Sequence, residues 1–272
     1  MITDKMIIVR GGGDMATAVI HRLWRAGFRV LVLETDRPAA IRRQVAVCEA
    51  VYDGCATVEG MTAVKIDALS LCSEVWDRGE VPLYVDPQGA CIAELAPAVV
   101  VDAIIAKRNL GTNMAMAPLT IALGPGFTAG GDVHAVIETM RGHNLGRIIT
   151  KGSAQPNTGL PGKIGGYAAE RVIHASHAGR IRHIRAIGDA VLAGEAIAVI
   201  NSADGEHPVS ASIPGLIRGL IREGYCVPQG FKIADIDPRR EEYENCFTIS
   251  DKARCIAGSV LELVCAQMIR CD

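Results

Sequence analysis

The sequence is poor in aromatic residues and nearly balanced in charge. Phe, Trp and Tyr together make up 4% of its 272 residues, and the formal net charge is −2 at pH 7. Surfaces that stack bases need aromatic rings, and surfaces that bind a phosphate backbone need an excess of Lys and Arg. We therefore expect no nucleic-acid partner.

The chain also lacks a long apolar segment. No run reaches the ~18 residues of a membrane-spanning helix. The first apolar run, residues 6–9, is short and is followed by Arg10 and three glycines, unlike the core of a signal peptide. We expect a cytoplasmic protein without a membrane partner.

No C-x-x-C pair occurs among the nine cysteines. Pairs at that spacing are typical of structural zinc sites, so we predict no metal site. The cysteines are odd in number and scattered through a chain without an export signal, which is typical of reduced thiols.

What the chain does contain is a strand–turn–helix–strand pattern over residues 6–34. The apolar residues 6–9 lead into Gly11-Gly12-Gly13, and a second apolar run, residues 30–33, ends at Glu34. Between them, apolar residues recur at helical spacing: Ala16, Val19, Ile20, Leu23 and Trp24. The pattern predicts a βαβ unit of a parallel sheet.

The turn of this unit has the form G-x-G-x-x-A, and an acidic residue follows at the roughly 20-residue distance of a ribose-binding carboxylate. Glycines let backbone N–H groups approach a phosphate, which the helix N-terminus also attracts. The candidate nucleotide- or cofactor-binding residues are Gly11, Gly12, Gly13, Asp14 and Glu34. Asp14, however, places a negative charge at the helix start, where a phosphate would bind. The alternative is therefore a glycine turn that only permits tight packing and binds no ligand.

Further apolar runs extend this pattern into a Rossmann-like parallel sheet. We expect strands at residues 62–66, 81–85, 99–105 and 120–123, and helices at 37–47 and 68–78. Ligands bind at the carboxyl ends of parallel strands, which makes Asp86 and Lys107 candidates. The alternative for Asp86 is a carboxylate that only caps a turn, and the alternative for Lys107 is a cation on a solvated face.

A second glycine-rich loop follows the run at 120–123. Its glycines include Gly124, Gly126 and Gly130, and a helical pattern begins at Asp132. This predicts a second strand–loop–helix junction that would bind an anion.

His134 and Glu138 would lie one turn apart on that helix, and His143 follows soon after. A His and a Glu beside a glycine loop suit acid–base chemistry or ligand binding. The alternative is a hydrogen-bonded pair that closes an interface.

The amino-acid composition changes near residue 151, where Gly and Pro become frequent, which indicates a domain boundary. Short alternating runs follow, at residues 171–175, 180–186, 196–200, 208–212, 216–221 and 232–236. Their turns resemble those of the biotinyl/lipoyl barrel-sandwich hybrid, at Gly188-Asp189, Gly194-Glu195, Gly215, Gly224 and Gly230. The hairpin at 200–207 lacks the carrier lysine, so we expect no covalent biotin or lipoate. We expect a rigid docking or substrate-closing domain instead.

An apolar stripe at helical spacing predicts a last helix over residues 251–269. Such a stripe must pack on the first domain or on a second copy of the chain, and we expect a homo-oligomer. We place the domains at residues 1–152 (α/β), 153–240 (all-β) and 241–272 (helical).

Five strings carry a family resemblance: residues 11–17 (GGGDMAT), 122–130 (ALGPGFTAG), 134–143 (HAVIETMRGH), 156–159 (PNTG) and 234–239 (ADIDPR). They resemble the YqeB-type accessory proteins of the selenium-dependent molybdenum hydroxylase system, over essentially the full chain. The α/β half is also similar to the cofactor-handling chaperones of xanthine dehydrogenase. The resemblance implies an accessory protein that handles the molybdenum cofactor or its selenium ligand, with a molybdenum hydroxylase or other maturation proteins as partners.

The predicted residues are compatible with that role. The molybdenum cofactor is an anionic pterin that carries phosphate, and two glycine-rich helix N-termini could hold it. Cys48, Cys55 and Cys91 are candidates for handling sulfur or selenium, whereas burial as small apolar residues is the alternative.

Two other functions stay open. Gly11, Gly13, Ala16 and Glu34 suit an NAD(P)-dependent oxidoreductase, although no Tyr-x-x-x-Lys pair supplies a hydride-transfer partner. A non-catalytic docking scaffold is the third hypothesis. The sequence leaves open whether any reaction is catalysed.

Overall fold

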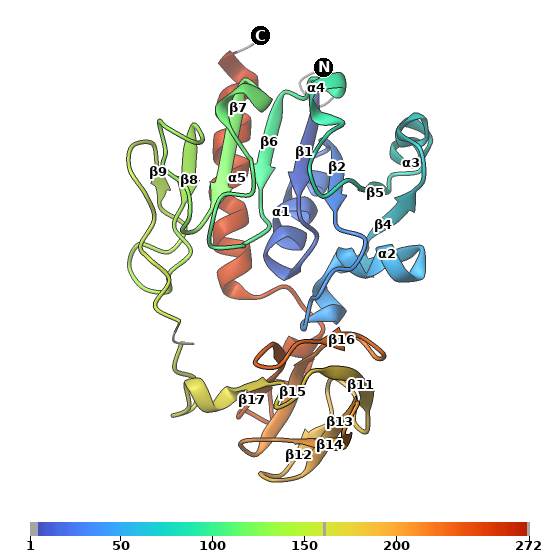
Figure 1. Cartoon of the computed structure of the whole chain (residues 1–272). Coiled ribbons are helices and arrows are strands. Elements are labelled where there is room, and N and C mark those ends of the chain that lie inside the picture. The colour runs from blue at the N-terminus through green and yellow to red at the C-terminus, as the bar shows by residue number, and fades with distance from the viewer. Residues whose placement is uncertain (1–4, 160–161, 271–272) are drawn as a thin grey trace. The chain divides into compact units, whose positions relative to one another are not determined.

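The computed structural model describes residues 5–159 and 162–270 and divides the chain into two compact units. Unit 1 comprises Met1–Pro38, Ala46–Thr158 and Ile249–Asp272, and unit 2 comprises Ala39–Val45 and Gly159–Thr248. Figure 1 shows the elements of each. Within the described ranges, no helix has both the length and the apolar character needed to cross a bilayer.

Unit 1 is built on a nine-stranded sheet with the order β3-β4-β5-β2-β1-β6-β7-β8-β9 (Figure 1). The strands are β1 Met6–Arg10, β2 Arg29–Glu34, β3 Cys55–Val58, β4 Met61–Ile66, β5 Val81–Val85, β6 Val99–Asp102, β7 Leu119–Leu123, β8 Ala135–Ile137 and β9 Ile148–Ile149. The seven inner strands of this order all run parallel to one another, whereas the edge strands β3 and β9 are antiparallel to their neighbours. The central strands are apolar runs because both of their faces are buried.

The helices of unit 1 are α1 Asp14–Arg25, α2 Ala50–Asp53, α3 Cys72–Asp77, α4 Ile92–Leu95 and α5 Asp251–Arg270, with short 3₁₀ turns η3 Val47–Glu49, η4 Leu69–Leu71 and η5 Met114–Met116. The βαβ unit of β1, α1 and β2 and the C-terminal helix α5 are confirmed. Helix α5 packs on α1 and contacts β7 and β8 (Figure 1). Its apolar stripe is therefore satisfied within the unit and does not by itself require a second copy.

The predicted Rossmann-like parallel sheet is wrong, because the sheet is mixed, with an antiparallel strand at each edge. The connections from β6 to β7 and from β7 to β8 contain no α-helix; both lie within the described residues. The helix predicted from Asp132 is replaced by the short strand β8. Val133, Val136 and Ile137 fit a helical period, but β-branched residues in such density favour a strand.

The helix predicted over residues 37–47 is also wrong. This segment forms only short 3₁₀ turns, η2 Arg43–Val45 and the start of η3. Its backbone pairs elsewhere: Ile41 accepts a hydrogen bond from Leu220 N–H at 2.8 Å, and Arg43 Nε donates to Leu220 O at 2.8 Å. Docking on strand β15 of unit 2 has replaced the internal hydrogen bonds of a helix.

Unit 2 contains two four-stranded antiparallel sheets, β10-β17-β15-β12 and β14-β13-β11-β16. The strands are β10 Val172–His174, β11 Gly179–His183, β12 Ala190–Val191, β13 Ala196–Ser202, β14 Gly205–Ser210, β15 Gly215–Leu220, β16 Cys226–Val227 and β17 Lys232–Asp237, with 3₁₀ turns η6 Ala169–Arg171 and η7 Tyr243–Cys246. Ile181, Ile200, Ile217 and Ile236 lie in its core. Each of the six predicted runs overlaps a strand, namely β10, β11, β13, β14, β15 or β17, whereas the two-residue strands β12 and β16 were not predicted.

The barrel-sandwich-hybrid assignment of this region is wrong: the strands form two separate antiparallel sheets. Glycine turns at near-regular spacing set the lengths of strands, but they do not determine which strands pair. The turns that carried the resemblance serve here as ordinary connections.

Candidate functional site

A cavity of about 370 Å³ opens at the carboxyl edge of the unit 1 sheet. Its lining comes from the ends of β1, β2 and β5 and from the loop after β6: Arg10, Gly11, Leu33, Glu34, Thr35, Asp86, Pro87, Gln88, Ile104 and Leu110. The cavity thus brings together three of the predicted site residues, Gly11, Glu34 and Asp86. This is the position at which open α/β sheets bind ligands.

The glycine loop after β1 is tightly packed on two sides. A Cβ atom at Gly11 would lie 3.1 Å from the backbone of Ala103 and Ile104, and Gly11 has φ +98°. A Cβ at Gly12 would lie 3.0 Å from Cys48 N. Only Gly13 has open space around it. The first two glycines are therefore required by packing, and the third leaves room at the start of α1.

Glu34 holds this loop in place. Its Oε2 accepts a hydrogen bond from Gly12 N–H at 2.7 Å, and its Oε1 accepts one from Thr35 N–H at 2.7 Å. Burial raises the pKa of the carboxyl, while these two hydrogen bonds lower it. Each carboxylate oxygen accepts more than one hydrogen bond, so Glu34 retains capacity for hydroxyl donors in the cavity.

Asp14 lies at the first position of α1, and its Oδ1 accepts a hydrogen bond from Met15 N–H at 3.0 Å. Two N–H groups of the turn, those of Gly12 and Met15, are thus already bound to carboxylates. Lys252, on the first turn of α5, lies within electrostatic range of Asp14 and Glu138. Burial lowers the pKa of Lys252, as does Arg141, whereas the two carboxylates raise it. Sequence reasoning missed Lys252 because its neighbours, at the start of α1 and just after β8, are distant in sequence.

Asp86 shapes the loop after β5. Its Oδ2 accepts a hydrogen bond from Cys91 N–H at 2.9 Å. Burial would raise the pKa of this carboxyl, but hydrogen bonds from the backbone of Cys91, Ala90 and Gly89 outweigh burial and lower it. Asp86 is therefore both a turn cap and a cavity wall, so the two alternatives for this residue coexist.

A buried polar network supports the cavity from behind, and sequence reasoning missed it. The guanidinium of Arg10, 1% exposed, donates to Thr112 Oγ1 and to Pro87 O, the latter at 3.0 Å. Thr112 Oγ1 in turn donates to Asp102 Oδ2, whose carboxyl lies 3.9 Å from Arg10. Burial raises the pKa of Asp102, against the effects of Thr112 and Arg10. The available signal was a charged residue at the end of each of two buried strands, Arg10 in β1 and Asp102 in β6.

The second glycine loop does not form the predicted anion site. It is followed by a strand, so no helix N-terminus faces it. Gly124 is packed on Thr139, and a Cβ at Gly126 would lie 2.6 Å from Arg108 N. Gly130 donates its N–H to Val133 O at 2.8 Å. Lys107 is exposed and has a left-handed backbone with φ +60°.

His134 and Glu138 lie at opposite ends of β8 rather than on one helix face. Four residues of extended chain separate them by roughly 13 Å. His134 Nδ1 accepts a hydrogen bond from Thr120 N–H at 3.0 Å at the start of β7. Glu138 accepts hydrogen bonds from Met140 N–H at 2.7 Å and Gln155 N–H at 2.8 Å. The expected acid–base pair is therefore absent, and the exposed His143 lies in the turn that follows.

The candidate thiols are mostly held in protonated form. Burial raises the pKa of Cys48 well above its usual range, and nearby carboxylates, Glu34 first among them, raise it further. Burial and a hydrogen bond to Asp86 raise the pKa of Cys91 to about 12. Cys55 is exposed. The eight cysteines of the described residues are free thiols, and Cys271 lies outside those residues.

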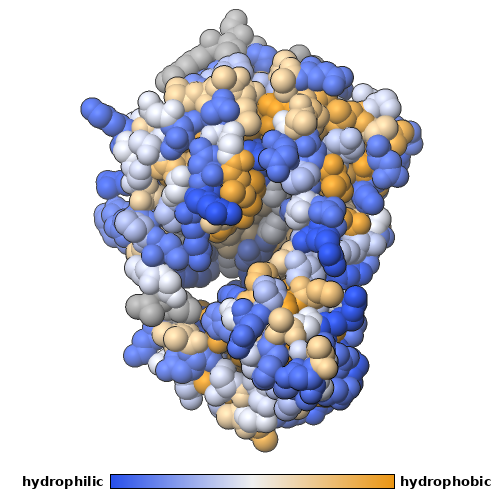
Figure 2. All heavy atoms as spheres, viewed as in Figure 1, coloured by the Kyte–Doolittle hydropathy of each residue, from blue (hydrophilic) through white to orange (hydrophobic). Residues whose placement is uncertain are grey.

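A larger cavity of about 470 Å³ lies beside α4. Figure 2 shows apolar surface gathered in this region of unit 1. The lining of this larger cavity, which includes Ile92, Met116 and Pro118, contains no ionisable side chain among the described residues. Of these two cavities, only the carboxyl-edge cavity is lined by ionisable side chains.

Solved structures give only weak similarity. The chain has a TM-score of 0.29 and 10% identity to the ectoine utilization protein EutE (DoeB) from Ruegeria pomeroyi, covering 86% of this chain and 85% of that one. For the succinylglutamatedesuccinylase/aspartoacylase from Rhodobacter sphaeroides the values are 0.29 and 13%, covering 87% and 86%. TM-scores this low do not support an assignment of function.

Sequence similarity is much stronger. No protein-family model matches the chain. Over 259 residues, however, it is 51% identical to "Uncharacterized protein YqeB" of Escherichia coli K12, an alignment that covers 95% of this chain and 47% of that protein. The chain spans about half the length of this curated relative. Because this 51% identity holds over 95% of the chain, the chain is a YqeB-type protein.

Proposed function

We propose that the chain is an accessory protein in the maturation of a selenium-dependent molybdenum hydroxylase. In this proposal it handles the molybdenum cofactor, or the selenium ligand of that cofactor, through the carboxyl-edge cavity of unit 1. The resemblance of five strings to YqeB-type accessory proteins supports this role. Because the chain spans about half of the relative's length, the activity of the whole protein belongs to the proposal as well.

The observation that carries the proposal is the position of Glu34. Its carboxylate is fixed by hydrogen bonds of 2.7 Å to Gly12 and Thr35 and forms part of the cavity wall. Ribose hydroxyls donate to a carboxylate in this position after the second strand of a nucleotide-binding sheet. Leu33, Ile104 and Leu110 give the same cavity an apolar wall against which a base can pack. We therefore assign the cavity to the nucleoside part of an anionic cofactor.

The phosphate part would lie at the open side of Gly13. The start of α1 offers N–H groups and partial positive charge there. Asp14 opposes an anion at this point, and Lys252 offsets it. The site thus favours a ligand whose affinity comes largely from its nucleoside end.

The experiment is a complementation test in cells that make the hydroxylase. A strain without the chain is expected to produce the hydroxylase protein at a normal level but without activity, and the wild-type chain should restore that activity. Glu34→Ala should fail to restore it. Glu74→Ala is the matched control, because the Glu74 side chain is 70% exposed on α3. Normal hydroxylase activity in the deletion strain would contradict the proposal.

Glu34 and the glycine turn also favour a second candidate, an NAD(P)-dependent oxidoreductase. A dinucleotide at 100 times its dissociation constant stabilises its protein by roughly 2.7 kcal/mol. This hypothesis predicts a higher melting temperature with NAD(H), and the increase should disappear in Glu34→Ala. No shift at millimolar NAD(H) would argue against it.

Partners and cellular location belong to the same proposal. A maturation role requires docking on the hydroxylase or on other maturation proteins, and we propose that the chain works in the cytoplasm as a homo-oligomer. The free thiols of the described residues suit a reducing compartment.

A further inference from the structure

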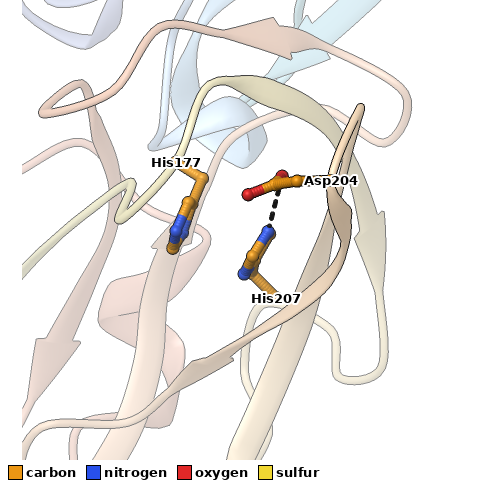
Figure 3. Close-up of side chains that lie close together, drawn as sticks. All are labelled: His177, Asp204 and His207. Carbon is orange, nitrogen blue, oxygen red and sulfur yellow. Dashed lines mark hydrogen bonds and ion pairs between the residues drawn. The ribbon is translucent and has the colours of Figure 1, made fainter.

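Two histidines and one aspartate meet in unit 2, far apart in sequence from the predicted site. His177 lies between β10 and β11, Asp204 lies in the turn of the β13–β14 hairpin, and His207 lies on β14. One ligand atom of each residue lies within 4.8 Å of those of the other two. Figure 3 shows the three side chains together at the tip of the hairpin.

The backbone holds the two loops that carry these side chains. Ser202 Oγ, beside the hairpin turn, donates a hydrogen bond to Ala178 O at 2.7 Å. A Cβ atom at Gly179 would collide with the carbonyl oxygen of Asn201, so only glycine permits this approach of β11 to β13. The hairpin closes by pairing Ser202 with Gly205, which leaves a two-residue turn that contains Asp204. The three side chains are therefore brought together by main-chain structure.

The three side chains contact one another and Ser176. His207 Nε2 lies 3.0 Å from Asp204 Oδ1 (Figure 3). His177 Nδ1 lies 3.0 Å from Ser176 Oγ. The rings of His177 and His207 stack with centroids 3.5 Å apart and an angle of 10°.

The donor set selects the class of ion. Two imidazoles and one carboxylate are borderline ligands that suit Zn²⁺ and its first-row neighbours, whereas Mg²⁺ and Ca²⁺ prefer oxygen ligands. An ion lies in the plane of each imidazole that binds it, so both rings must rotate out of the stack. The Ser176 hydroxyl beside His177 Nδ1 is a partner of the kind that orients a metal-binding ring.

We propose that His177, Asp204 and His207 bind a divalent transition-metal ion, with Zn²⁺ as the reference, and leave at least one coordination position open. Three protein ligands and an open position are the arrangement of zinc sites that bind a further molecule. The sequence predicts no metal site because it lacks Cys pairs, but the ligands here are His and Asp on separate loops. The site is independent of the proposed function of unit 1.

The test is a metal titration of the full chain after removal of metals with a chelator. Zn²⁺ is added in competition with a chromophoric chelator, and Co²⁺ provides a visible absorption spectrum that reports coordination geometry. We expect one ion per chain, with affinity reduced at least ~10-fold in His177→Ala and in His207→Ala, as for the loss of groups that support a metal. His174→Ala is the matched control, because His174 is an exposed histidine on β10 three positions away.

The proposal would be overturned if uptake did not saturate at one Zn²⁺ ion per chain, if His177→Ala or His207→Ala kept the wild-type affinity, or if His174→Ala lost affinity equally. Circular dichroism of each metal-free variant tests its fold. If a histidine variant does not fold, Asp204→Asn gives the decisive comparison, since the Asp204 side chain is 66% exposed in a turn. Unchanged affinity in Asp204→Asn would then exclude the three-residue site.

Discussion

The two loops of unit 1 that are rich in glycine have different structures. Residues 11–13 lead into α1, whereas residues 124–131 lead into the strand β8. In both loops a glycine allows close approach of another backbone: Gly11 approaches Ala103 and Ile104, and Gly126 approaches Lys107 and Arg108. In both cases a glutamate after a parallel strand binds backbone N–H groups, Glu34 in the first and Glu138 beside the second.

The difference lies in what the loops leave open. Gly13 has free space before a helix N-terminus, and Glu34 forms part of a cavity wall. Beside the second loop, Glu138 is 3% exposed and both of its oxygens serve neighbouring backbone. Glycines in such a loop therefore indicate a close approach of two backbone segments. Whether a ligand can also bind there depends on the element that follows the loop, a helix in the first case and a strand in the second.

The largest expected effect comes from Gly126→Ala. The added Cβ would lie 2.6 Å from Arg108 N, and φ at this position is +107°. Strain and collision together are expected to lower the free energy of unfolding by about 3 kcal/mol. Both tryptophans, Trp24 and Trp76, belong to unit 1, so their fluorescence during urea unfolding reports on this unit alone.

Two other glycines calibrate this effect. Gly11→Ala should cost less than Gly126→Ala, since its nearest contacts would be at 3.1 Å. Gly142→Ala is the control for strain without collision: φ is +129° and no atom would lie within 4 Å of the new Cβ. We expect a loss of about 1 kcal/mol there. Equal losses at all three positions would refute the role of close approach.

A medium effect is expected from Glu138→Gln. Glutamine keeps one acceptor oxygen, so one of the N–H groups of Met140 and Gln155 loses its partner in a buried position. Leaving a buried donor unsatisfied costs about 1–3 kcal/mol. The same urea titration should show a smaller loss for Glu34→Gln, whose carboxylate lies at a cavity. A larger loss for Glu34→Gln would reverse the comparison of the two loops.

The smallest effect is a pH dependence specific to the first loop. Burial raises the pKa of Glu34, so the folded state holds its proton at pH values where the unfolded state has released it. Stability therefore falls as the pH rises from the ordinary pKa of glutamate through the raised folded value. Glu34→Gln should remove this part of the slope and leave the similar contribution of Asp102. An unchanged slope in the variant would contradict the assignment.

Local patterns predicted much of the fold. The apolar runs at 81–85 and 120–123 became β5 and β7, and the helical stripes became α1 and α5. Glu34 and Asp86 could be assigned to one cavity because parallel strands end at the same edge of a sheet. The helix predicted from Asp132 was wrong because the spacing of Val133, Val136 and Ile137 suits either structure.

The features that local patterns did not predict depend on contacts between segments that are distant in sequence. Lys252 reaches Asp14 and Glu138 only because α5 packs beside α1. Arg10, Thr112 and Asp102 form one network across 102 positions of sequence. His177 meets Asp204 and His207 through the pairing of β11 with β13. None of these partners has a local signal that identifies the others.

The position of α5 has a consequence for synthesis of the chain. This helix covers β7 and β8, but it follows the whole second part of unit 2, residues 159–248. At ~5–20 residues per second, a ribosome needs roughly 5–18 s to add those 90 residues. During that time the strands already made lack their cover, while unit 2 has all of its own strands before α5 is translated. We therefore expect unit 2 to fold first and unit 1 to close last, although unit 1 contains the N-terminal strand.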